Sequence, residues 1–169
     1  MKHSLLRFSI LVLLLAVNAA MLADTFEVNG ICYETTSSST VQVTSRSFKY
    51  RGNVVIPDSV NYDGIKYRVT SIGPCAFYEC SGLSSVTIPN SVKIIDDKAF
   101  WGCKGLTSIN IPNSVIRIGD YALDGCSGLT SINIPHSVTE IGICVFAGCS
   151  GLKLVIIDDK VVYPYSSNH

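Results

Sequence analysis

The sequence predicts a solenoid of short parallel β-strands, stacked rung on rung and joined by turns and single helical turns. Two observations predict this fold. Cys80, Cys103, Cys126 and Cys149 are each separated by 23 residues, and the segments between them align without a gap. With 47% hydrophobic and 15% charged residues, the 169-residue chain is also apolar enough to bury a core. A unit of this length cannot bury its own apolar face and has to stack on a neighbour.

Residues 1–23 have the pattern of a secretory signal peptide, in which a basic start precedes an apolar run at 8–17. Small residues then lead to a cleavage site after Ala23 or Ala19. The apolar run has about half of the roughly twenty residues needed to span a bilayer. We therefore expect a chain that is secreted or held at the cell surface, with no membrane span in its mature part.

The charge balance argues against a nucleic-acid partner. The chain has thirteen Lys and Arg and thirteen Asp and Glu residues. Without the first 23 residues, which hold two of the basic residues and no acid, the charge is 11 − 13 = −2. A slightly acidic surface cannot attract DNA or anionic lipid.

Residues 24–52 are expected to form an N-terminal β cap. The stretch Phe26–Tyr33 reads as an antiparallel hairpin through Asn29-Gly30, and Thr40–Thr44 as a further strand. These strands would cover the edge of the first rung.

The repeats are expected at residues 53–157, ahead of a C-terminal tail at 158–169. They comprise a degenerate unit at 53–79, full units at 80–102, 103–125 and 126–148, and a partial unit at 149–157. The degenerate unit holds an extra segment at 61–67, whose Asp63-Gly64 is a hairpin-turn dipeptide.

Within a unit, apolar residues that alternate along a strand are followed by a proline that ends it, as in Ile109, Ile111 and Pro112. An Ala-Phe or Ala-Leu pair further on is expected to form one helical turn. Recurring glycines on either side of this turn suggest backbone sites of positive φ. These glycines are Gly73, Gly119 and Gly142 before the turn, and Gly82, Gly105, Gly128 and Gly151 after it.

The repeated pattern C-S-G-L-T-S-I-x-I-P-x-S-V-x-x-I-G-x-x-A-F-x-G resembles the BspA-like class of leucine-rich repeats, over about residues 24–157. The resemblance implies an exported surface protein of bacterial type, which attaches to extracellular matrix components or to other cells.

The four recurring cysteines are expected to form a structural ladder of buried, reduced thiols. Rungs about 4.8 Å apart with parallel Cβ vectors keep the Cβ atoms farther apart than the roughly 3.8 Å of a disulfide. Cys75 and Cys144 lie three rungs apart, too far to bridge each other, and the sequence leaves their redox state and that of Cys32 open.

No residue pattern points to catalysis or to a bound cofactor. The Cys-x4-Cys pairs lie several rungs apart, so they do not form a zinc site. His136 replaces an asparagine in an exposed turn, and Asp96-Asp97 and Asp158-Asp159 read as solvated surface. We therefore expect no enzyme, no cofactor and no metal.

The strand residues that alternate with the core are expected to form an exposed concave binding face. They are Ser85, Ser108, Ser131 and Leu154 in one row and Thr87, Asn110, Asn133 and Ile156 in the next. Four rungs give roughly 250 Å², well below the 800 Å² or so that each partner gives to a stable interface.

The predicted function is an exported binding module for a protein or glycan ligand. Either its contacts are weak and multiplied by avidity, or flanking loops and the N-terminal cap add to the contact. One alternative is a structural element that stacks with another chain through a final rung left uncovered after Ile157. The other is a truncated piece of a longer repeat protein.

Overall fold

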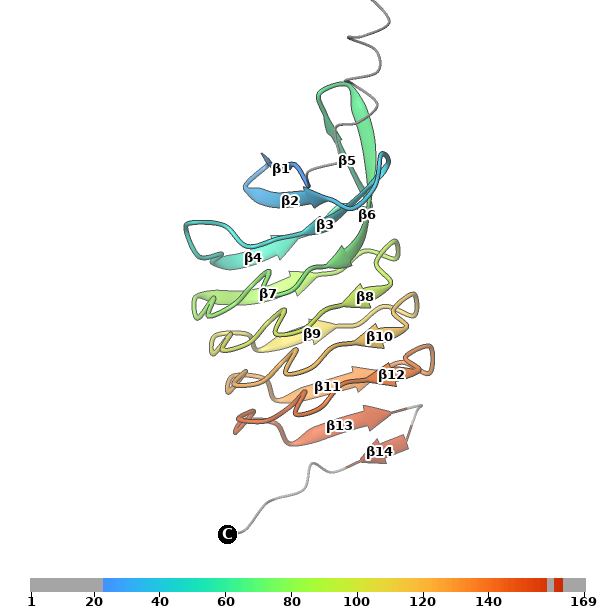
Figure 1. Ribbon diagram of the computed structural model, residues 1–169. Helices are drawn as coiled ribbons and strands as arrows, with labels where there is room; N and C mark the ends of the chain where they lie inside the picture. Colours follow the sequence, from blue (N-terminus) through green and yellow to red (C-terminus); the bar gives the residue numbers. More distant parts are fainter. Residues whose placement is uncertain (1–22, 158–159, 163–169) are drawn as a thin grey trace, which may run out of the picture.

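The computed structural model describes residues 23–157 and 160–162, which form a stack of rungs with the N-terminal cap at one end (Figure 1). The expected signal peptide at 1–23 lies, except for its last residue, outside the described residues. No helix that could span a membrane occurs among those residues.

The cap begins with an antiparallel hairpin, as the sequence predicts. Strands β1 (Thr25–Val28) and β2 (Ile31–Thr35) are joined by Asn29 and Gly30, whose φ values of 50° and 79° are those of a tight hairpin turn. Strand β3 (Thr40–Val43) pairs antiparallel with β2 and then parallel with β6.

The extra segment of the degenerate unit forms a second hairpin, which projects beyond the cap (Figure 1). It consists of β5 (Ser59–Tyr62) and β6 (Ile65–Ile72), joined by Asp63 and Gly64 at positive φ. Phe26 stacks on Tyr62 with ring centroids 4.0 Å apart, which fixes the hairpin to the cap.

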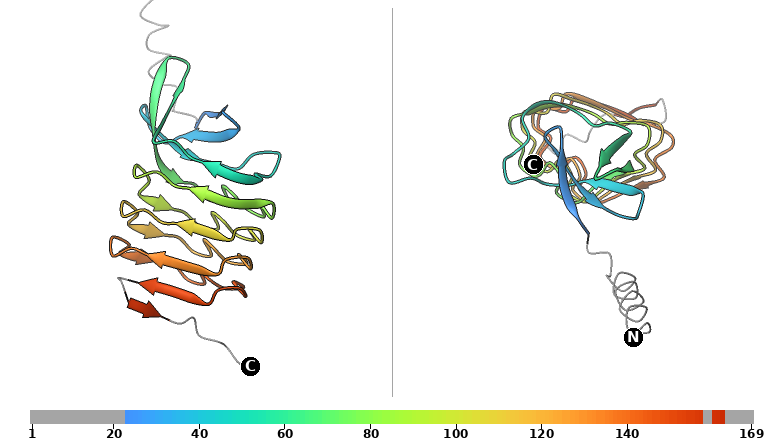
Figure 2. Two further views of the ribbon diagram at one scale, coloured as in Figure 1. Left: turned by 180° about the vertical axis from the view of Figure 1, so that it is seen from behind. Right: turned by 90° about the horizontal axis from the view of Figure 1, so that it is seen from above.

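Two faces of the stack carry strands. Long strands form one face: β4 (Gly52–Val55), β7 (Leu83–Thr87), β9 (Ser108–Asn110), β11 (Ser131–Ile134) and β13 (Leu154–Ile157). Short strands continue the sheet of the cap on another face: β8 (Ile94–Ile95), β10 (Arg117–Ile118) and β12 (Glu140–Ile141). Equivalent residues of successive rungs pair in parallel, so each position of the repeat forms a column (Figure 2).

The columns between the faces form the core. Leu83, Leu106 and Leu129 are completely buried, and the rings of Phe77 and Phe100 stack with centroids 5.0 Å apart. Each column therefore buries the same kind of side chain against its neighbours in the adjacent rungs. A single repeat has no such neighbours to cover its apolar side chains, so it is not stable alone.

The expected single helical turns are not helices in the described residues. The Phe77 N–H donates to the Ala99 carbonyl at 2.7 Å, and the Phe100 N–H to the Ala122 carbonyl at 2.8 Å. These N–H groups point to the next rung, whereas in an α-helix they would point back along their own segment. Lys98 and Tyr121, at φ 55°, turn the backbone into this arrangement.

The prediction of positive φ at the recurring glycines is wrong for both sets. The left-handed positions of the repeat form two other columns: one holds Glu79, Gly102, Gly125 and Gly148, and the other holds Cys75, Lys98, Tyr121 and Cys144. Most of the predicted glycines are required by close contact between rungs. A Cβ atom on Gly119 would lie 2.6 Å from the Asp97 backbone nitrogen, and one on Gly128 would lie 2.5 Å from the Lys104 carbonyl oxygen. Gly82 differs, because a Cβ atom there would meet only the Arg51 side chain, at 3.1 Å.

The last long strand is covered by a strand that the sequence placed in a tail. Strand β14 (Lys160–Val162) pairs antiparallel with Val155–Ile157 of β13. The expectation of an uncovered rung after Ile157 is therefore wrong, because these backbone groups already have partners. Residues 158–159 and 163–169 of the expected tail lie outside the described residues.

Candidate binding face

The structure brings the eight predicted face residues into two parallel rows on the long strands. Ser85 pairs with Ser108 and Thr87 with Asn110, between β7 and β9. Between β11 and β13, Ser131 pairs with Leu154 and Asn133 with Ile156. The residues between them in sequence, Val86, Ile109, Ile132 and Val155, point into the core and are buried. Because successive side chains of a strand point to opposite faces, the residues of the two rows point outward.

Two residues of β4 extend these rows and were missed from the sequence. Asn53 pairs with Ser85, whose Oγ donates a hydrogen bond to Asn53 Oδ1 at 2.9 Å. Val55 pairs with Thr87 and is 66% exposed. The strand belongs to the degenerate unit, and its register shifts after Gly52, which hid the correspondence. Aligning Pro57 with Pro89 would have revealed it. The ten residues of both rows are called the polar strand face below.

The polar strand face changes character along the stack. From β4 to β11 it presents hydroxyl and amide groups, apart from Val55, whereas Leu154 and Ile156 make it apolar at β13. None of its ten residues is charged. Short hydroxyl and amide groups both donate and accept hydrogen bonds, and they lose little side-chain entropy when they are ordered. The face is therefore suited to recognition by hydrogen bonds and shape.

The cysteine ladder is a packing element and not a binding site. The thiols of Cys103, Cys126 and Cys149 donate to the carbonyl oxygens of Phe77, Phe100 and Leu123, at 3.0, 3.2 and 3.1 Å. All seven cysteines lie within the described residues, and each is a free thiol.

Burial also lowers the reactivity of two of the ladder thiols. Desolvation raises the pKa of Cys149 from 9.0 to about 12 and raises the pKa of Cys80 as well. Because the thiolate is the nucleophile and the metal ligand, Cys80 and Cys149 are poorly suited to either role near neutral pH.

The aspartate pair Asp96-Asp97 is more than solvated surface. Arg117 Nη1 lies 3.0 Å from Asp96 Oδ1, and Arg117 Nη2 lies 3.3 Å from Asp97 Oδ1. The hydrogen bond that Arg117 donates to Asp96 is the largest cause that raises the pKa of Arg117. Asp97 Oδ1 also accepts the Asp120 N–H at 2.9 Å, so this carboxylate joins two rungs. The pair Asp158-Asp159 lies outside the described residues.

The remaining candidates for chemistry lie apart. His136 is exposed in its turn. Cys32 donates to Glu27 Oε2 at 3.6 Å, Cys75 is half-buried and Cys144 is exposed. Within the described ranges, no three His, Cys, Asp or Glu side chains lie close enough together to hold a metal ion.

Comparison with known proteins decides the family. The family model described as "BspA type Leucine rich repeat region" matches residues 53–167 in six copies, which is more than half of the chain. The chain belongs to this BspA-type leucine-rich repeat family. Such repeat proteins are generally non-enzymatic modules for protein–protein interaction.

Solved structures of other leucine-rich repeat proteins share the fold of this BspA-type chain. A protein from Bacteroides capillosus is 30% identical, with a TM-score of 0.70 over 79% of this chain and 97% of its own. One from Bacteroides ovatus is 34% identical, with a TM-score of 0.57 over 77% of this chain. The Treponema pallidum protein TpLRR is 26% identical, with a TM-score of 0.58 over 78% of this chain and 71% of its own.

The BspA-type chain spans only 40% of the length of the Bacteroides ovatus protein. Among curated proteins, none matches it significantly.

Proposed function

We propose that this chain is an exported binding module, which attaches through its polar strand face to a protein or glycan at or beyond the cell surface. Components of the extracellular matrix and the surfaces of neighbouring cells are the ligands we propose. The observation that carries this proposal is the pair of in-register rows of uncharged and mainly polar side chains. These rows occur in a family whose repeats generally bind proteins.

Export is supported by the leader pattern at residues 1–23. The mature chain would then expose the polar strand face outside the cell. An array as short as this one is also compatible with the third possibility, a piece of a longer repeat protein, since the match covers only 40% of the Bacteroides ovatus relative. The binding proposal applies to the face itself in either case.

The size of the face sets the expected strength of binding. With β4 included, five rungs about 4.8 Å apart and about four residues wide give roughly 300 Å². A stable interface takes about 800 Å² from each partner. One copy should therefore bind weakly, and many copies on one surface should bind firmly through avidity.

The test compares the chain in solution with the chain clustered on beads, against a panel of matrix proteins and glycans. Asn110→Arg places a bulky charge in the middle of the face and should abolish clustered binding. Asn113→Arg, the same change in an exposed turn outside the face, is the matched control and should bind like the unmodified chain. Absence of binding in both formats, or equal loss in both variants, would refute the proposal.

Assembly with another chain is a second candidate function. Strand β12 is at the edge of its sheet among the described strands. Ile141 on this strand and Ile143 two residues after it are 47% and 61% exposed. Exposed apolar residues at a strand edge favour pairing with a strand of another chain. Light scattering over a wide concentration range tests this function. Growth of the particle with concentration, reversed by Ile141→Lys, would support it, and a monomer throughout would rule it out.

A further inference from the structure

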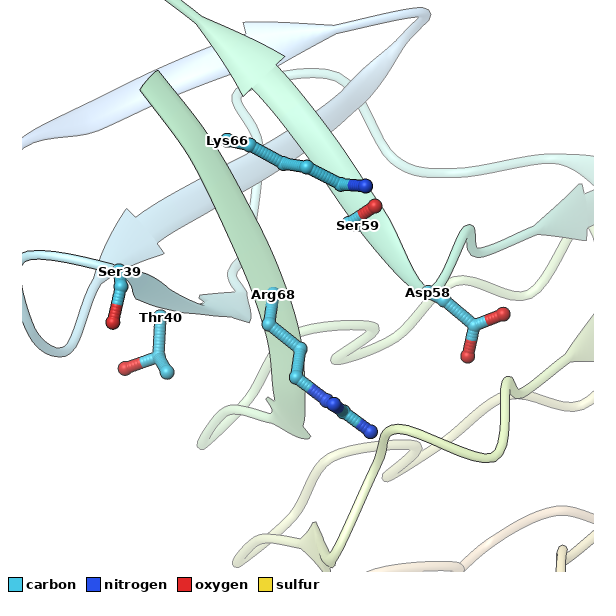
Figure 3. Close-up of a pocket in the computed structure, with 6 residues that line it drawn as sticks. All are labelled: Ser39, Thr40, Asp58, Ser59, Lys66 and Arg68. Atoms are coloured by element: carbon cyan, nitrogen blue, oxygen red, sulfur yellow. The ribbon is translucent and has the colours of Figure 1, made fainter.

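A polar pocket of about 480 Å³ opens beside the projecting hairpin. It is lined by Ser39, Thr40, Asp58, Ser59, Lys66 and Arg68 (Figure 3). These residues come from the cap and the hairpin, so the pocket belongs to a different sheet from the polar strand face.

Strand pairing explains why these side chains converge. Strand β6 lies between β3 and β5, and Arg68 is paired with Thr40 on one side and Ser59 on the other. Lys66 is two residues before Arg68 on the same strand and so lies on the same face. The extra segment 61–67 provides the end of β5, the hairpin turn and the start of β6, including Lys66. The repeats that lack the segment cannot form such a pocket.

The pocket carries two cationic groups without a carboxylate partner. The ion pairs found among the described residues involve Arg46 and Arg117, and none involves Lys66 or Arg68 within 4.0 Å. Both side chains are exposed, and Figure 3 shows Lys66 extending towards Ser59, with Asp58 beyond it. An anion bound in the pocket would give these cations the charge partner that they lack.

We infer that this pocket binds the acidic sugar residue of a glycan. The sugar carboxylate would pair with Arg68, whose guanidinium can donate two parallel hydrogen bonds, and with Lys66. Sugar hydroxyl groups would bond with the serine and threonine hydroxyls and donate to the Asp58 carboxylate. The volume is within the range of about 300–1,000 Å³ that is common for ligand pockets.

The lining favours a sugar over other anions. None of the six lining side chains is apolar or aromatic, so the pocket offers nothing to the apolar groups of an acidic peptide. A bare sulfate has no proton to donate to Asp58, whereas a sugar hydroxyl can donate a hydrogen bond to this carboxylate. An acidic sugar carries a carboxylate and several hydroxyls on one small ring. It can therefore pair with the cationic side chains and also form hydrogen bonds with Asp58 and the serine and threonine hydroxyls.

The test is calorimetric titration of the purified chain with glucuronic acid, glucose and inorganic sulfate. Glucuronic acid should bind most tightly, and its affinity should fall as salt is added. The double variant Lys66→Gln/Arg68→Gln should lower that affinity by about tenfold or more. The matched control Lys93→Gln/Lys104→Gln removes two exposed positive charges elsewhere and should leave the affinity unchanged.

Three results would overturn the inference: glucose binding as tightly as glucuronic acid, sulfate binding as tightly as glucuronic acid, or equal affinity in the two double variants. Circular dichroism of each variant would establish that it is folded. Asn110→Arg separates this pocket from the proposed function, because it should abolish binding by the polar strand face and leave glucuronic acid binding intact. Clustered binding to a matrix ligand without affinity for glucuronic acid would overturn the pocket alone.

Discussion

Replacement of Gly128 by alanine tests why glycine recurs in every repeat. The Cβ atom of an alanine here would lie 2.5 Å from the Lys104 carbonyl oxygen and 3.2 Å from that of Leu106. Both obstacles are backbone atoms of the preceding rung, so they cannot move aside as a flexible side chain could. Gly125, three residues earlier, provides the contrast. It has φ 72°, and a Cβ atom there would meet nothing closer than 3.4 Å, at Gly102.

The two sites should differ in magnitude and in kind. Overpacking against fixed atoms costs about 3 kcal/mol, whereas placing alanine in the left-handed region at Gly125 costs about 1 kcal/mol. For a chain of this size, 3 kcal/mol lowers Tm by roughly 6–12 °C. Asparagine tolerates the left-handed region, so Gly125→Asn should be more stable than Gly125→Ala. At Gly128, asparagine should be no better than alanine.

The assay is urea unfolding followed by circular dichroism, with all four variants at one protein concentration. The steric explanation predicts that Gly128→Ala loses more stability than Gly125→Ala. If Gly125→Ala were the less stable of the two, or if asparagine restored stability at Gly128, the reasoning from rung contact would be refuted.

Three further predictions follow from the core, the ion pairs and the thiols. Phe100→Ala should cost about 3–5 kcal/mol in unfolding free energy. Phe100→Leu should cost only about 1.5 kcal/mol, because the next rung already holds Leu123 in the same column. Equal losses of the two variants in urea unfolding would contradict this expectation. Arg117→Met should lower the unfolding free energy by about 1 kcal/mol or less, because its ion pairs are partly exposed and solvent screens them. The difference in stability between this variant and the unmodified chain should shrink in high salt. A difference that grows would argue against an electrostatic role. Exposed Cys144 should react with a thiol reagent in the native chain, while Cys149 should react only after unfolding. Burial raises the pKa of Cys149 from 9.0 to about 12, so the unfolded chain loses this thiol proton at a lower pH than the folded chain. The free energy of unfolding should therefore fall as pH rises from about 9 to about 12. Equal urea midpoints at about pH 8 and about pH 11 would contradict the pKa argument.

Much of the fold could be predicted because the information is local and repeated. Asn29-Gly30 and Asp63-Gly64 each specify a hairpin by their own backbone preferences. The proline that follows β4, β7, β9 and β11 marks where each of these strands ends. The spacing of Leu83, Leu106 and Leu129 then requires that equal positions stack.

The site was predictable to the extent that it depends on alternation along a strand. The rows that contain Ser108 and Asn110 follow from the period of two and the 23-residue repeat. Asn53 and Val55 were missed because the strand β4 lies in a unit whose spacing the inserted hairpin changes. No pattern in the sequence indicated that Arg68 would lie between two hydroxyl-bearing strands.

The sequence by itself determined the repeat, the hairpins and the identity of the core columns, because these depend on residue types at fixed spacing. Only the tertiary structure decided which glycines adopt positive φ and which are needed for close contact, since both kinds recur with the same period. It also decided that Asp97 joins two rungs and that β14 covers β13. These features depend on which atoms of one rung face the next rung and how closely they approach. A periodic pattern of residue types does not contain that information.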